Sequence, residues 1–406
     1  MKKFFSTLNK TQKKNLITLV VFGGMIAITG TFGWYNHRAA ASVDYSKTLP
    51  AQTALESHML IGGDMYWGRE MHKWAQESSL KEAYPFSRLG EFERDKYDAW
   101  IANLECPTVP GVKQDVNFVP ELWEFNCDTD YLPELAKWFD IVGLANNHTA
   151  NQSREKGQEA TRGALDAQNI QHFGGFNPHV KEDVCSVVAL PARATIDGQQ
   201  KDVKLPVAMC GYHGVYYTIT DAAINRIKEY AKYMPVISYV HMGREYQATP
   251  DDERRELYHK MIDAGADAVI GNHPHWVQPT EEYKGKLIVY SMGNLIFDQQ
   301  FSPEVMRSAL IDTTLSIARD RVNNDTLRAW TDLGETCVKS NNTCLQTAKD
   351  KNLARMPATL RYSIVGADLS NQITHKANQR LLDEILVRLN WADTASKLTR
   401  EPLLAN

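Results

Sequence analysis

The sequence predicts a mixed α/β protein in which a mostly parallel sheet packs against a second sheet, with a transmembrane helix at the N-terminus. Three observations predict this class. Short apolar runs alternate with segments of helical periodicity from about residue 57 to residue 276, as in a parallel sheet with helical crossovers. Later runs, from residue 286 onward, alternate apolar and polar residues as in a second sheet. Near the N-terminus, a lysine-rich segment precedes about twenty uncharged residues.

The N-terminal segment divides into a cytoplasmic tail (1–15), a membrane anchor (16–35) and a linker (36–56), followed by one exported domain (57–406). A run of about twenty apolar residues spans a bilayer as a helix, and lysines before it keep the N-terminus in the cytoplasm. A cleaved signal peptide is the alternative, because small residues at 39–42 suit a peptidase. Both interpretations place the main domain outside the cytoplasm.

Five apolar runs are expected to be strands, and each ends in a short polar loop. The runs end at Asp64, Glu105, Asn147 with His148, His241, and Gly271. Helices are expected between them at 131–139, 153–169, 221–233 and 250–265. Further strands are expected at 286–299, 307–318 and 358–370, with C-terminal strands from about residue 320 and an amphipathic helix over 371–391.

The charge balance excludes one class of partner. The formal net charge is -4 and the isoelectric point is about 6.3. Nucleic-acid binding has no support from such a composition, since it requires a basic surface.

The cysteines are disulfide candidates if the domain is exported, because oxidising compartments favour disulfides. None of them lies in a CxxC or CxxH pattern. Six cysteines allow fifteen pairings, and proximity in the sequence favours Cys106 with Cys127, Cys185 with Cys210, and Cys337 with Cys344. Six buried thiols are the alternative.

Polar residues at the ends of the predicted strands are candidate metal ligands. Loops at the carboxyl ends of neighbouring strands converge, so residues placed there can meet in one site. The residues concerned are Asp64, Glu105, Asn147, His148, His241, His273 and His275. Carboxylates, an amide oxygen and imidazoles together suit one or two divalent transition metals such as Mn, Fe, Zn or Co. Two such ions with a bridging carboxylate favour hydrolysis of a phosphoester or a related bond.

The motifs GGDMYWGRE, ANLECP, GLANNHT, HMGREY and the block 265–299 resemble, in order and spacing, the CapA family of capsule synthesis proteins, named for poly-γ-glutamate. The resemblance covers about residues 57–320. That family is similar to the calcineurin-like metallophosphoesterases, so the resemblance implies a four-layer αββα sandwich. It also implies a bacterial inner or plasma membrane location, with capsule synthesis and export proteins and an anionic polymer such as poly-γ-glutamate as partners.

The resemblance also implies roles for the candidate ligands. It assigns Asp64 and His275 to a first metal, Asn147, His241 and His273 to a second, and Glu105 to both. His148 would protonate a leaving group or stabilise the transition state. One departure stands out, because metallophosphoesterases carry Asp-x-His on the first strand and this chain has Tyr66 in place of the histidine. The first metal would then lack one ligand.

Five further residues are weaker candidates. Arg244 and Glu245 follow His241 and could support a histidine or bind a substrate carboxylate, although exposed surface charge explains them equally well. Asn294 and Asp298 could line the same pocket or form a turn. Arg69 could face an anionic substrate, although a solvated arginine is the simpler interpretation. The remaining histidines are interpreted as structural or surface residues.

Two functions compete. The first is a membrane-anchored metal-dependent hydrolase acting in capsule polymer synthesis or export. The second is a non-catalytic polymer-binding or assembly component of a capsule export complex. A phosphoesterase unrelated to capsule is a third interpretation, because one fold hosts many chemistries.

Overall fold

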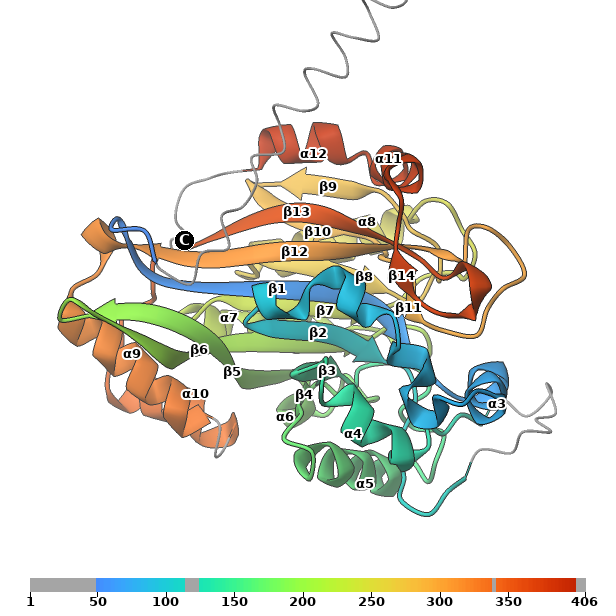
Figure 1. Cartoon of the computed structure of the whole chain (residues 1–406). Helices are drawn as coiled ribbons and strands as arrows, with labels where there is room; N and C mark the ends of the chain where they lie inside the picture. Colours follow the sequence, from blue (N-terminus) through green and yellow to red (C-terminus); the bar gives the residue numbers. More distant parts are fainter. Residues whose placement is uncertain (1–48, 114–123, 338–340, 399–406) are drawn as a thin grey trace, which may run out of the picture. The chain divides into compact units, whose positions relative to one another are not determined.

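The computed structural model describes residues 49–113, 124–337 and 341–398. These residues form a mixed α/β fold (Figure 1), which confirms the α/β class. The expected second, separate sheet is not seen, because the described strands form one 14-stranded sheet. The predicted membrane anchor, residues 16–35, lies outside the described residues. Within the described ranges, no helix combines the length and the apolar character needed to cross a membrane.

Strand β1 (Thr53–Met65) is the central strand of the first group. Its N-terminal part pairs with an antiparallel strand, β12, and its C-terminal part pairs with the parallel strands β2 and β11. Parallel pairing continues from β2 through β3 to β4. The bounds are Ala99–Leu104 for β2, Ile141–Gly143 for β3, Gln171–Phe173 for β4, Asn294–Ile296 for β11 and Arg307–Ala318 for β12.

A second group begins with the antiparallel hairpin of β5 and β6 and continues in parallel through β7, β8 and β10. Strand β9 closes this edge by pairing antiparallel with β10. At the opposite edge of the path, β13 pairs with β12 and β14 with β13. The bounds are Cys185–Ile196 for β5, Gln199–His213 for β6, Val236–His241 for β7, Ala268–Asn272 for β8, Thr280–Tyr283 for β9, Lys286–Val289 for β10, Ala358–Asp368 for β13 and His375–Lys376 for β14.

Helices connect these strands and cover them. Side-chain caps define two of their starts: Thr220 accepts a hydrogen bond from the backbone of Ala223, and Asp251 accepts one from that of Arg254. The bounds are Arg69–Glu77 for α3, Leu132–Leu135 for α4, Glu155–Asp166 for α5, Lys181–Val184 for α6, Asp221–Ala231 for α7, Asp252–Asp263 for α8, Asn324–Cys337 for α9, Asn341–Asp350 for α10, Gln379–Arg388 for α11 and Trp391–Lys397 for α12.

The core divides between the two faces of the β1–β2–β3 sheet, as the two-residue period of strands requires. Ile61, Ile101 and Ile141 belong to one buried cluster, together with residues of β5 to β8 and of helices α7 and α8. Leu60 and Trp100, each next to one of these isoleucines, belong to a second cluster on the side of α3, α4 and α5. Helices α9 and α10 lie beside β5 and β6 (Figure 1).

The three disulfides predicted from sequence proximity are present. Their pairs are Cys106 with Cys127, Cys185 with Cys210, and Cys337 with Cys344. The pair Cys185 and Cys210 lies in register across the β5–β6 hairpin. All six cysteines of the chain are therefore paired.

Several predicted boundaries were wrong. The linker was expected to reach residue 56, but β1 already begins at Thr53, because this segment pairs with β12. The helix expected over 371–391 is instead the strand β14 followed by the separate helices α11 and α12, with Asn390 in a left-handed conformation at the break. Helices α9 and α10 were not expected.

Candidate metal centre

The carboxyl ends of strands from both groups meet in one buried cluster. His241, the last residue of β7, lies with Nδ1 3.6 Å from Oδ1 of Asp64 on β1. Its other nitrogen, Nε2, lies 3.4 Å from Oε1 of Glu105, which directly follows β2. All three residues are buried. Residues 64, 105 and 241, far apart in the sequence, are thus brought together by the sheet topology.

Four potential ligand atoms of the second predicted site converge. His241 Nε2 lies 2.7 Å from Asn147 Oδ1, 3.2 Å from His273 Nδ1 and 3.4 Å from Glu105 Oε1. Ligand atoms of Glu105, His241 and His273 all lie within 4.8 Å of one another. This spacing is compatible with a single bound cation.

The first predicted site forms a separate group that shares one member with the second. Ligand atoms of Asp64, Glu105 and His275 also lie within 4.8 Å of one another. His275 Nδ1 lies 3.6 Å from Asp64 Oδ2. Glu105 therefore belongs to both groups, which is the position of a bridging carboxylate.

The turn after β8 sends its two histidines to different groups. Both have left-handed backbones, with φ of 93° at His273 and 57° at His275, on either side of Pro274. Such conformations cost about 1–3 kcal/mol each in non-glycine residues and concentrate at functional sites. The backbone N–H of His273 donates to Asp64 Oδ2 at 3.1 Å, which ties this turn to β1.

Buried amides orient these ligands. Asn294 Nδ2 donates to the carbonyl of Val305, so its Oδ1 is an acceptor and His275 Nδ1 donates to it at 2.8 Å. The Nε2 lone pair of His275 is then left for a ligand. Asn103, two residues before Glu105, donates from Nδ2 to Asp64 Oδ1 at 2.8 Å.

His148 lies beside the cluster, with Nε2 4.0 Å from Glu105 Oε1. Its Nδ1 is 2.8 Å from Asn151 Oδ1. Burial lowers the pKa of His148 to about 3, so the imidazole of the metal-free protein is neutral at physiological pH.

The cluster has the electrostatic character of a cation site, and the residues fit a metal. Burial and then the charge of Asp64 raise the pKa of Glu105 well above its usual range, and its Oε2 atom has no hydrogen-bond partner. Burial also raises the pKa of Asp64 to about 7 and lowers the pKa of His241 and of His273 well below the usual value. Buried carboxylates facing neutral imidazoles are stabilised when a cation binds between them.

We expect the metal-free protein to lose stability as the pH falls from about 6.5 toward 4. Burial lowers the pKa of His275 to about 4, whereas the unfolded chain titrates near 6.5. The unfolded chain therefore gains protons that the folded chain does not, and the free energy of unfolding falls by up to about 1.4 kcal/mol per pH unit for each such histidine.

Asp64 acts in the opposite direction, since its raised pKa stabilises the folded protein at low pH and this contribution is lost as the pH rises through about 7. The histidines of the cluster with lowered pKa outnumber its two carboxyls, so the net sign is a loss on acidification. Thermal unfolding in a chelator across this pH range checks it. A midpoint that rises on acidification would contradict this result.

A cavity of about 270 Å³ opens next to the cluster. Its walls are Arg69, Phe125, Asn147, His148, Tyr216, Glu245, Tyr246, His275, Phe297 and Gln299. Arg69 forms two hydrogen bonds with Asp298, at 2.5 and 2.9 Å, so the charge of this wall residue is balanced by a carboxylate outside the lining. Arg244 is exposed and is not part of the wall, while Glu245 is.

Tyr66 is the residue that the sequence pattern places where a histidine ligand is expected. Its ring is fully buried, 4.3 Å from the ring of Phe125, and its hydroxyl has no hydrogen-bond partner. Burial raises the pKa of Tyr66 above its usual range, so the phenol stays neutral. A neutral phenol is a poor replacement for an imidazole ligand.

Sequence reasoning missed several residues around the cluster. His213 was interpreted as structural or surface, but it ends β6 in register with His241, and its Nδ1 donates to the carbonyl of Phe176 at 2.7 Å. The strand-end rule that found His241 applies equally to the run ending at His213. Asn103 could also have been identified from the sequence, because it lies two residues before Glu105 and residues two apart on a strand share a face.

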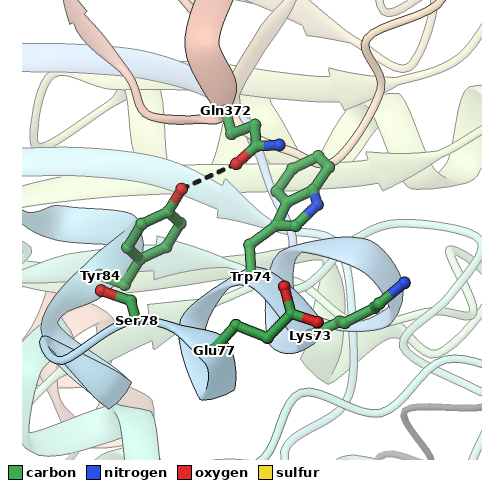
Figure 2. A pocket seen from close by; sticks show the side chains of 6 residues that line it. All are labelled: Lys73, Trp74, Glu77, Ser78, Tyr84 and Gln372. Carbon is green, nitrogen blue, oxygen red and sulfur yellow. Dashed lines mark hydrogen bonds between the residues drawn. The ribbon is translucent and has the colours of Figure 1, made fainter.

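A second pocket lies on the surface between α3 and the segment around Gln372. Figure 2 shows Trp74, Lys73 and Glu77 on one side and Tyr84 on another, with the Tyr84 hydroxyl donating to Gln372 Oε1. It contains none of the clustered ligands.

Comparison with known proteins decides the family. The profile of the family described as "Bacterial capsule synthesis protein PGA_cap" matches residues 58–299, more than half of the chain. This chain belongs to that family. All the candidate metal ligands of the two groups lie inside the matched range. The resemblance seen in the motifs is therefore confirmed.

Two curated relatives carry capsule names. The "Capsule biosynthesis protein CapA" of Bacillus anthracis is 31% identical over 73% of this chain and 72% of the relative. The "PGA biosynthesis protein CapA" of Bacillus subtilis (strain 168) is 33% identical, but the match spans only 40% of this chain and 43% of the relative. The relative from Bacillus anthracis thus supports the same family, of which this chain is a member.

Solved structures match at low similarity. A hypothetical protein from Thermus thermophilus has 16% identity and a TM-score of 0.36, over 64% of this chain and 92% of its own. Another protein of the same organism, TT1561, has 10% identity and a TM-score of 0.34, over 63% of this chain and 94% of its own. Likeness at this level does not bear on function.

Proposed function

We propose that this CapA-family chain is a metal-dependent hydrolase that acts on a phosphoester or a related bond during synthesis or export of poly-γ-glutamate or a related capsule polymer. The observation that carries the proposal is the shared position of Glu105 in two buried ligand groups. A single bridging carboxylate between two cation sites is the arrangement used for hydrolysis assisted by two metals.

The proposed setting is the outer side of a bacterial inner or plasma membrane, with residues 16–35 as a single-pass anchor and the N-terminus in the cytoplasm. The pairing of all six cysteines supports export, because disulfides persist in oxidising compartments. We further propose that the domain is a four-layer αββα sandwich of the metallophosphoesterase type. Its support is the division of the helices between two buried clusters, with α3, α4 and α5 in one and α7 and α8 in the other. Its proposed partners are capsule synthesis and export proteins and the polymer itself.

The proposed cofactor is one or two divalent transition metals, Mn, Fe, Zn or Co. Asn147, Glu105, His241 and His273 would hold one ion, and Asp64, Glu105 and His275 the other. When bound, such ions polarise the scissile bond and activate water. A bound cation would favour an anionic substrate, because Glu245 lines the cavity and two further carboxyls are buried in the adjacent cluster.

His148 is the proposed proton carrier. The residue lines the cavity, and its Nε2 lies 4.0 Å from Glu105 Oε1, while Nδ1 is engaged by Asn151. We expect His148→Ala to lower kcat by about 10²- to 10⁴-fold, the usual effect of removing a general acid or base, while bound metal stays unchanged. The measurement is hydrolysis of a panel of phosphomonoesters, phosphodiesters and γ-glutamyl compounds by the full chain loaded with each metal in turn. His172→Ala is the matched control, since that imidazole pairs with Asp166 outside the cluster. Equal activity of His148→Ala and wild type would remove His148 from the mechanism.

A non-catalytic role as a polymer-binding or assembly component is the second candidate, and the tyrosine at position 66 favours it because the first metal lacks a ligand. Complementation separates the two. A chain with both His241→Ala and His273→Ala that restores capsule fully in a deletion strain would support the assembly role and overturn the hydrolase.

A further inference from the structure

An aromatic side chain from a disulfide-closed loop covers His148. The ring of Phe125 lies 3.7 Å from the His148 ring, centroid to centroid, with only 10° between their planes. Phe125 also stacks on Tyr66 at 4.3 Å and lies 4.7 Å from the Arg69 guanidinium carbon. It is buried, although it forms part of the cavity wall. A ring in this position limits the orientations open to the imidazole.

Hydrogen bonds from the same residue determine which nitrogen of His148 carries the proton. The backbone N–H of Phe125 donates to Asn151 Oδ1 at 3.1 Å. Because an N–H can only donate, this atom of Asn151 is the carbonyl oxygen and not the amide nitrogen. His148 Nδ1, 2.8 Å from the same oxygen, must therefore donate as well. The neutral imidazole is then the Nδ1–H tautomer, and its unprotonated Nε2 lies 4.0 Å from Glu105 Oε1.

The Cys106–Cys127 disulfide places Phe125 there. Cys106 directly follows Glu105, and Cys127 lies two residues after Phe125, with a Cα–Cα distance of 5.7 Å across the bridge. Backbone contacts support it, because Cys127 N–H donates to the Pro107 carbonyl at 2.8 Å. Gln152 Nε2 donates to the Phe125 carbonyl at 3.2 Å. The backbone N–H and the backbone carbonyl of Phe125 are therefore both hydrogen-bonded to side chains that follow His148.

We propose that Phe125 is a positioning residue that, held by the Cys106–Cys127 bridge, sets the ring orientation and the Nδ1–H tautomer of His148. Neither Phe125 nor the cysteines take part in bond making. The effect of Phe125 and the bridge on catalysis rests on the proposed function. Their effect on the orientation and tautomer of the His148 imidazole does not. Through this bridge, Glu105, the candidate ligand shared by both groups, is linked to the positioning of His148.

The test reads the imidazole directly. In the metal-free full chain labelled with ¹⁵N-histidine, the His148 signals, assigned by their loss in His148→Gln, are expected to show protonated Nδ1 and ring protons shifted by the stacked phenyl ring. Phe125→Leu is expected to lose the ring-current shift and to mix the two tautomers. Phe125→Tyr, which keeps the ring, is expected to retain both signatures.

Kinetics give the second readout. Phe125→Leu is expected to lower kcat by about 10- to 100-fold, the effect of displacing a catalytic group by about 1 Å, with KM and bound metal nearly unchanged. The matched control is Phe139→Leu, a buried phenylalanine that packs on Trp100 away from the cavity. Cys106→Ser with Cys127→Ser should reproduce the effect of Phe125→Leu, and Cys337→Ser with Cys344→Ser should not.

Two results would overturn the inference. One is an Nε2–H tautomer in the wild-type chain, and the other is Phe125→Leu with unchanged histidine signals. A chain that hydrolyses nothing but shows the expected tautomer and its loss would defeat the proposed function and leave the positioning of His148 supported.

Discussion

Replacing His241 and His273 together by alanine is expected to remove nearly all transition metal from the purified full chain. The two imidazole atoms lie 3.2 Å apart and supply half of the four ligands proposed for the second site, leaving Glu105 and Asn147. Changing even an outer hydrogen-bond partner of a metal ligand costs about 10- to 100-fold in affinity. Loss of two direct ligands is therefore expected to cost about 100-fold or more.

Elemental analysis after gel filtration, followed by competition with a chelator of known affinity, measures this loss. The matched control replaces two histidines that pair with carboxylates outside the cluster, His172 with Asp166 and His259 with Glu281. The control should keep the wild-type metal content. Circular dichroism on both double variants separates lost ligands from lost fold. Wild-type protein without stoichiometric metal would reject the metal centre itself.

The second large effect is an inequality between the two sites. Wild-type chain titrated with Mn²⁺ or Zn²⁺ is expected to show two classes of affinity, separated by at least about 10-fold. The stronger class has four candidate ligands. The weaker has only Asp64, Glu105 and His275, because the chain carries the buried Tyr66 where the sequence pattern leads us to expect a further histidine.

Substitutions at both sites test this assignment. Asp64→Asn should abolish only the weaker class, and Glu105→Gln should weaken both because its carboxylate is shared. Tyr66→His should strengthen the weaker class, whereas Tyr66→Phe should leave both unchanged, since a neutral phenol contributes no ligand. Calorimetric titration measures the two classes. Two sites of equal affinity in the wild-type chain would contradict this assignment. A loss of metal in Tyr66→Phe would show that Tyr66 is itself a ligand.

The strand-end pattern predicted most of the candidate ligands because parallel strands bring their carboxyl ends to one edge. Asp64, Glu105 and His241 each follow an apolar run, and these runs are β1, β2 and β7. The same reasoning passed over His213, which ends β6 next to β7, because the hairpin of β5 and β6 was not expected. When a strand is not predicted, the residue at its end is not identified as a candidate ligand.

Element boundaries were less predictable where pairing or a local backbone conformation decides them. The start of β1 at Thr53 depends on its pairing with β12, whose Ala318 lies more than 250 residues away. The C-terminal helix was expected to be continuous, but it is divided at Asn390, where the backbone is left-handed. Sequence periodicity alone does not show which distant strand pairs with a segment or where the backbone turns left-handed.

The sequence by itself determined the α/β class, the pairing of cysteines close in sequence, the family and the residue types of a mixed nitrogen and oxygen site. Only the tertiary structure decided that Glu105 belongs to two ligand groups, that Tyr66 is buried with no partner for its hydroxyl, and that Phe125 stacks on His148. The physical reason is that residue type and spacing report local periodicity. Which side chains face one another depends on how distant strands pair and on where the Cys106–Cys127 bridge holds Phe125.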